Sequence, residues 1–94
     1  MSHFTSHNQS LTTKSIVIND ILFKRSGNTV TMTSQGNWTL NGEVTIPEDF
    51  RPSDKTLIIV IDTVKNQIGV DFLNKNATKY TTNGYVYIFG VWTI

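Results

Sequence analysis

The sequence offers few side chains that could perform acid–base or nucleophilic chemistry. Its two histidines, His3 and His7, lie in a polar stretch near the start, and the chain contains no cysteine. No Ser–His or Cys–His pair is therefore expected on a folded core. The seven carboxylates are scattered over predicted turns and strand ends, at Asp20, Glu43, Glu48, Asp49, Asp54, Asp62 and Asp71. Their spacing does not indicate a glycosidase pair, and we predict that the chain is not an enzyme.

Metal and cofactor sites are also not expected. His3 and His7 have the spacing of two ligands on one helical turn, but the residues around them lack a helical pattern. Without cysteine there are no thiolate ligands, and no Gly-rich phosphate-binding loop occurs. We predict no metal and no cofactor.

Aromatic side chains are the best candidates for contacting a ligand. Tyr and Trp can stack on a flat ligand face while their polar tips remain in water. The residues of this type are Trp38, Tyr80, Tyr85, Tyr87 and Trp92. A sugar ring binds such a side chain through its C–H face, while Asp, Asn and Thr take its hydroxyl groups. The alternative is that these rings only fill the hydrophobic core, and both interpretations remain open at this point.

The final segment, residues 85–94, is the most apolar predicted strand. Strand alternation assigns large apolar side chains to both of its faces. Since one face is enough for an intramolecular core, the other is expected at a contact with a further subunit. The candidate interface residues are Tyr85, Tyr87, Phe89 and Trp92.

Composition identifies the elements that must position these residues. The 14 Thr, 10 Ile and 8 Val make 32 of the 94 residues β-branched, whereas Ala occurs once. Such side chains fit a pleated sheet and lose more freedom in a helix. The sequence therefore predicts an all-β fold, a small antiparallel β-sandwich or barrel of seven to eight strands.

Periodicity places these strands between residues 15 and 94. Residues 29–33 alternate strictly, and residues 55–62 are apolar on both faces, as in a strand between two packed layers. Asn83-Gly84 is a hairpin signal before the last strand. Residues 1–14 are polar without periodicity and are interpreted as a disordered segment or as a stalk or linker, so that 15–94 form one domain.

Charge and hydropathy exclude several partner classes. The net charge is +1 without a cluster of basic residues, which does not favour nucleic acid or an anionic membrane. The longest apolar run, residues 57–61, is far shorter than the roughly 18 residues of a membrane helix. The start of the chain lacks the basic and apolar regions of a signal peptide. Because a chain this small buries only about 60–65% of its unfolded surface, a partner subunit is expected.

Several motifs occur in a characteristic order. A predicted strand ends in Pro-x-x-Phe-Arg-Pro at residues 47–52, followed by Gly-x-Asp at 69–71 and Gly-Tyr-x-Tyr-x-x-Gly-x-Trp at 84–92. The segment Arg-Ser-Gly-Asn-Thr-Val at 25–30 fits an opening hairpin. Over residues 16–94 this arrangement resembles the C-terminal head domain of tailed-phage receptor-binding proteins, such as the baseplate tips of lactococcal siphophages.

The resemblance implies a homotrimer of small β-barrel heads at the phage tail tip, made in the host bacterial cytoplasm before assembly into the virion. Its partners would be further copies of the chain, other tail or baseplate proteins, and a host cell-wall polysaccharide or teichoic acid. Such heads bind the saccharide without cleaving it. Two alternatives remain: a ligand-free structural trimerisation or capping domain, and a non-catalytic carbohydrate-binding module.

The resemblance also implies a saccharide site. In the lactococcal heads a His-x-Asp strand, and a Trp about nine residues after the Asp, line the binding cleft. These positions fall on Asp71 and Tyr80 here, whereas the His position falls on Gly69, which removes a hydrogen-bonding group. Trp38 completes the candidate saccharide contacts. The alternative for Asp71 is a structural pairing with Arg51 or a lysine.

Overall fold

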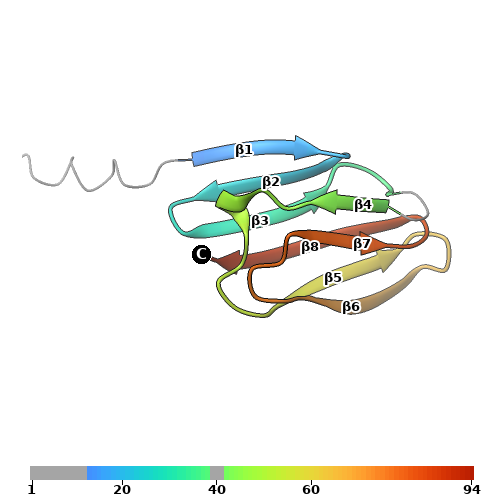
Figure 1. Ribbon diagram of the computed structural model, residues 1–94. Helices are drawn as coiled ribbons and strands as arrows, with labels where there is room; N and C mark the ends of the chain where they lie inside the picture. Colours follow the sequence, from blue (N-terminus) through green and yellow to red (C-terminus); the bar gives the residue numbers. More distant parts are fainter. Residues whose placement is uncertain (1–12, 39–41) are drawn as a thin grey trace, which may run out of the picture.

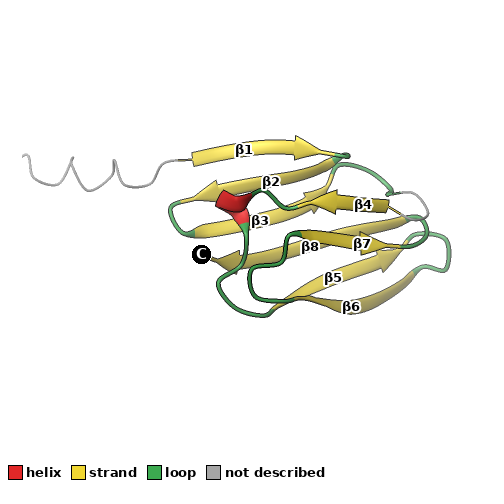
Figure 2. Cartoon of the chain, viewed as in Figure 1, coloured by secondary structure: helices red, strands yellow, loops and turns green. Residues whose placement is uncertain are grey.

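The computed structural model describes residues 13–38 and 42–94, which form eight strands and one short 3-10 turn (Figures 1 and 2). The elements are β1 Thr13–Ile18, β2 Ile21–Ser26, β3 Thr29–Ser34, β4 Gly42–Thr45, η1 Glu48–Phe50, β5 Thr56–Asp62, β6 Gln67–Leu73, β7 Lys79–Thr82 and β8 Val86–Thr93. The all-β prediction is confirmed. Because β1 begins at Thr13, the last two residues of the predicted stalk belong to the sheet, while residues 1–12 lie outside the described part.

The strands form two antiparallel sheets. The large sheet has the order β1-β2-β3-β8-β5-β6, and β4 pairs with β7 in a second sheet. Figure 2 shows this two-stranded sheet lying over one face of the large sheet. The covered side is called the inner face below, and the opposite side the outer face.

Hairpin turns use residues that tolerate a left-handed backbone. Asn19 and Asp20 join β1 to β2 with φ of 51° and 63°, as a two-residue type I′ turn requires. The predicted Asn83-Gly84 hairpin is wrong, because β7 pairs with β4 whereas β8 pairs with β3 and β5, so this segment connects the two sheets. Gly84 still has a positive φ of 89° where the chain changes sheet. The side chain of Asn19 also donates to the Glu43 carbonyl at 2.7 Å, which ties the first hairpin to β4.

The hydrophobic core lies between the two sheets. Its buried side chains are Ile21, Phe23, Val30, Met32, Trp38, Val44, Ile46, Phe50, Ile58, Leu73, Tyr80, Val86, Ile88 and Trp92. The inward positions predicted from the alternation of residues 29–33, Val30 and Met32, are fully buried. Every buried side-chain nitrogen or oxygen in the two described stretches has a hydrogen-bond partner. The core between the two sheets, within these stretches, therefore contains no buried polar side-chain atom without a hydrogen bond.

The outer face of β8, β5 and β6 is apolar and exposed. Directly paired residues share a face, and the register pairs Ile59 with both Val70 and Phe89. The outer apolar face consists of Leu57, Ile59, Ile61, Ile68, Val70, Phe72, Tyr87, Phe89 and Val91. Eight of these nine are 42–76% exposed, and Ile61 is partly buried. On the β1–β3 half, the same face is occupied mainly by Thr, Ser and Lys.

The expectation that residues 55–62 lie between two packed layers is therefore met on one side only. Residue Ile58 on the inner side of β5 is fully buried, whereas Leu57 and Ile59 on the outer side are 54% and 42% exposed. Among residues 13–38 and 42–94, the strands of the second layer are the short β4 and β7, which pack on the inner face. Within the described residues, no strand covers the outer apolar face, although the Lys55 ammonium lies 4.5 Å from the centroid of the Phe72 ring.

Candidate functional site

The three predicted saccharide contacts lie together. The Tyr80 hydroxyl on β7 donates to Asp71 Oδ2 on β6 at 2.9 Å. The rings of Tyr80 and Trp38 stack with centroids 6.4 Å apart and an interplanar angle of 23°. Trp38 is held by a β-bridge to Val86, with backbone hydrogen bonds of 2.8 and 3.1 Å. Residues distant in sequence thus form one cluster, the Asp71–Tyr80–Trp38 cluster.

The two rings of this cluster are not open for stacking. Tyr80 is 4% and Trp38 6% exposed, and both belong to the hydrophobic core. A Cβ built on Gly42 would lie 2.5 Å from Trp38 Cε2, which shows how closely the backbone approaches that ring. The expected stacking surface is therefore corrected: the rings are core side chains in this conformation, while Asp71 is exposed.

Burial and hydrogen bonding also control the chemistry of Tyr80. Desolvation, and then the hydrogen bond to Asp71, raise the pKa of the Tyr80 phenol well above its usual value. The phenol therefore remains neutral and continues to donate to the carboxylate at all physiological pH values. This arrangement links β7 to the inner side of β6.

Neither Asp71 nor Arg51 makes the predicted structural ion pair. The two salt bridges in residues 13–38 and 42–94 join Lys14 to Asp49 and Lys79 to Glu43. Arg51 Nε instead donates to the backbone carbonyl of Ile46 at 3.0 Å. This hydrogen bond holds the loop that follows β4 in place.

The four predicted interface residues separate into two groups. Tyr87 and Phe89 lie on the outer apolar face, 45% and 43% exposed, and Tyr85 precedes β8 with 51% exposure. Trp92 is 5% exposed and points inward, where its Nε1 donates to the Phe50 carbonyl at 2.7 Å. Its assignment to the interface is corrected, because the pairing of Val30 with Trp92 places both on the inner face.

Two surface features were not found from the sequence. One is the contribution of β6 to the outer apolar face, through Ile68, Val70 and Phe72, which are 76%, 62% and 51% exposed. Their strict alternation with Gly69 and Asp71 in the sequence could have predicted that these three side chains share one face of the strand.

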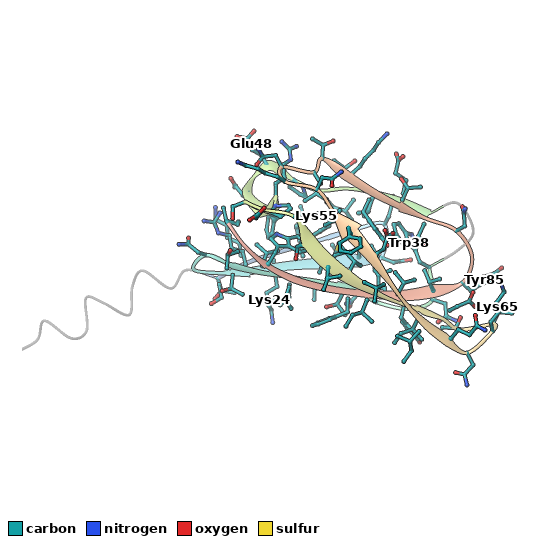
Figure 3. The ribbon with its side chains drawn as sticks, turned by 90° about the horizontal axis from the view of Figure 1, so that it is seen from below. Lys24, Trp38, Glu48, Lys55, Lys65 and Tyr85 are labelled. Carbon is teal, nitrogen blue, oxygen red and sulfur yellow. The ribbon has the colours of Figure 1, made fainter. Side chains whose placement is uncertain are left out.

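The other feature is an open hollow of about 420 Å³ where the β5–β6 and β7–β8 loops meet. It is lined by Asp62, Val64, Lys65, Asn83, Gly84 and Tyr85. Figure 3 shows Tyr85 and Lys65 at the same end of the molecule. We call it the Tyr85 hollow. The sequence did not predict that these two loops lie together, because both consist of ordinary turn residues.

No metal centre is apparent in the described stretches, which contain no group of three or more His, Asp or Glu side chains placed to hold an ion. The pair His3 and His7 lies outside those residues. Among the helical segments described, none has the length and apolar character needed to cross a membrane.

Comparison with family models, with curated proteins and with solved structures found no match to this chain. Its function is therefore inferred from its own residues and their geometry.

Proposed function

We propose that this chain is a non-enzymatic head domain of a phage tail or baseplate protein, which assembles as a homotrimer and binds a saccharide of the host cell surface. The outer apolar face is the observation that carries the proposal. Nine apolar side chains cover three neighbouring strands, and the Lys55 ammonium lies at their edge, over the Phe72 ring. A contiguous exposed surface of this kind favours a protein–protein contact over exposure to water.

A second copy of the chain fits this surface best. None of the nine side chains of the outer apolar face is charged, and the Lys55 ammonium lies over its edge, 4.5 Å from the centroid of the Phe72 ring, so the partner must present a mainly uncharged surface. The same face on another copy of the chain meets that condition, so no different protein is needed. Most soluble oligomers are symmetric assemblies of one chain. The number three comes from the resemblance to phage receptor-binding heads.

Saccharide binding is supported by the chemistry of the remaining surface. The chain has 14 Thr and nine Asn but only 16% charged residues. Hydroxyl and amide groups can donate to and accept from sugar hydroxyls. A trimer would present each weak site three times, and multivalency raises the avidity for a repetitive cell-wall polymer.

Two measurements test the proposal. Analytical ultracentrifugation at micromolar concentration should give a mass about three times the 10.6 kDa of one chain. Sedimentation with purified bacterial cell walls, from a panel of hosts, should remove the trimer from solution. A monomer at every concentration would contradict the assembly, and no retention on any wall preparation would contradict recognition.

The burial of Trp38 and Tyr80 favours a second candidate, a ligand-free trimerisation or capping domain of the same kind of particle. A stable trimer that no wall preparation retains would support this candidate. A monomer that is retained would instead support a carbohydrate-binding module.

A further inference from the structure

We propose that the Tyr85 hollow is a saccharide subsite that accepts a pyranose ring against Tyr85. This inference rests on the proposed recognition of a saccharide and gives it a location away from the Asp71–Tyr80–Trp38 cluster. The hollow has three relevant properties: an exposed aromatic ring on a hydrogen-bonded backbone, polar groups in its lining, and sufficient volume.

The aromatic ring is exposed while its backbone is held. Tyr85 is 51% exposed, in contrast to the buried Tyr80. Both the backbone N–H and the hydroxyl of Thr63 donate to the Tyr85 carbonyl, at 2.9 and 2.8 Å. The next residue, Val86, is paired with Trp38. With its backbone held, Tyr85 has only its two side-chain torsions to order when a ligand stacks on the ring, so the entropic cost is small.

The lining of the hollow also carries polar groups, and Asp62 is held by hydrogen bonds. Asp62 Oδ1 accepts the backbone N–H groups of Val64 and Lys65, both at 2.9 Å, which holds the 62–65 turn in place. These hydrogen bonds, led by that from Lys65, lower the pKa of Asp62, so the carboxylate is charged at neutral pH. Both bonds use Oδ1, and within residues 13–38 and 42–94 no partner is seen for Oδ2. A ligand hydroxyl can donate to it.

The remaining side chains complete the donor and acceptor set. The Asn83 amide both donates and accepts, and the Lys65 ammonium donates. Together with Asp62 they can satisfy several hydroxyl groups on the rim of a ring whose C–H face lies on Tyr85. The hollow is therefore suited to an amphipathic, hydroxyl-rich ligand.

The volume of about 420 Å³ falls within the roughly 300–1,000 Å³ of small-ligand sites. An adjoining hollow of about 220 Å³ shares Asp62 and Asn83, which gives room for a second sugar unit. A third hollow, near Lys55, includes Trp92, but that ring is 5% exposed and offers no stacking face. The Tyr85 hollow is thus favoured over the other two.

A titration of the full chain by ¹⁵N-resolved NMR tests the subsite. The probes are the methyl glycosides of glucose, galactose, rhamnose and N-acetylglucosamine, each taken to roughly ten times a Kd of about 1 mM. At least one should shift the amide resonances of residues 62–65 and 83–86. Tyr85→Ala should weaken that binding about tenfold or more, whereas Tyr85→Phe, which keeps the ring, should preserve it.

Lys75→Ala, an exposed lysine in the β6–β7 loop, is the matched control and should bind like the unmodified chain. The subsite is overturned if no probe shifts these resonances, or if Tyr85→Ala responds like the unmodified chain. Wall retention on the same samples separates the two proposals. Retention that survives Tyr85→Ala contradicts the subsite alone, whereas absent retention of the unmodified chain contradicts recognition itself.

Discussion

Replacing Val70 by Thr should separate the folding of this domain from its assembly. Val70 lies on the outer apolar face of β6, directly opposite Ile59, and is 62% exposed. Threonine keeps the β-branched shape and the high strand propensity of valine. Because the side chain faces water in a single copy, Val70→Thr should change the free energy of unfolding of the monomer by less than about 0.5 kcal/mol.

The effect on the trimer should be much larger. Removal of a methyl group that is 62% exposed before assembly costs about 0.5 kcal/mol, taking about 0.8 kcal/mol per buried CH₂. A hydroxyl buried in the contact without a partner costs about 1–3 kcal/mol more. The sum is about 1.5–3.5 kcal/mol per chain and about 4.5–10 kcal/mol per trimer.

This loss translates into a shift of the assembly curve. Trimer formation depends on the cube of the monomer concentration. The midpoint concentration of assembly therefore rises by the square root of the factor by which the association constant falls. The expected rise is about 50-fold to about 5,000-fold. Sedimentation velocity over a dilution series measures the midpoint, and circular dichroism of the dilute chain measures unfolding.

Val17→Thr is the matched control. Val17 lies on the same face of the large sheet, on the opposite edge strand β1, and is 56% exposed. It lies outside the outer apolar face, so its replacement should leave the assembly midpoint unchanged. If Val70→Thr assembles like the unmodified chain, or if both variants weaken assembly equally, the outer apolar face is not the subunit contact.

Three further predictions concern the core. Gly42→Ala should lower the free energy of unfolding by about 1–3 kcal/mol in urea denaturation, because the new Cβ would lie 2.5 Å from the buried ring of Trp38. Trp92→Phe should destabilise by about 2–4 kcal/mol in the same assay, since it creates a void and removes the donor to the buried Phe50 carbonyl. The raised pKa of Tyr80 predicts that its contribution to stability is constant below about pH 10 and decreases above it. The unfolded chain ionises at this pH while the folded phenol stays neutral, and the slope from this group approaches about 1.4 kcal/mol per pH unit in pH-dependent denaturation.

Each of these predictions has its own control. Gly36→Ala introduces a Cβ with no atom within 4 Å and should be nearly neutral, so equal effects at the two glycines would refute the close approach to Trp38. Tyr80→Phe should remove its share of the high-pH decrease, and an unchanged profile would assign the decrease to other groups. For Trp92→Phe, stability equal to that of the unmodified chain would show that the hydrogen bond contributes nothing.

Local sequence patterns were sufficient for the strands and several turns. Alternation at residues 29–33 predicted that Val30 and Met32 are buried, and both are. Asn83-Gly84 predicted a break before β8, and Gly84 has a positive φ there, but the predicted hairpin did not form because β7 and β8 belong to different sheets. These features depend on the two-residue period of a strand and on the φ values that a turn demands, and both are properties of neighbouring residues.

The choice between the two apolar faces of the large sheet was decided only by tertiary structure. Alternation showed that Phe89 and Trp92 lie on opposite faces of β8, but it could not show which face β4 and β7 would cover. Likewise, Tyr80 was a reasonable ligand contact until β7 packed over β6 and buried its ring against Trp38. Tyr85 and Asp62 became neighbours only because two separate loops end at the same side of the sandwich. A strand's own sequence determines which residues share a face, whereas burial of that face depends on contacts with segments distant in the chain.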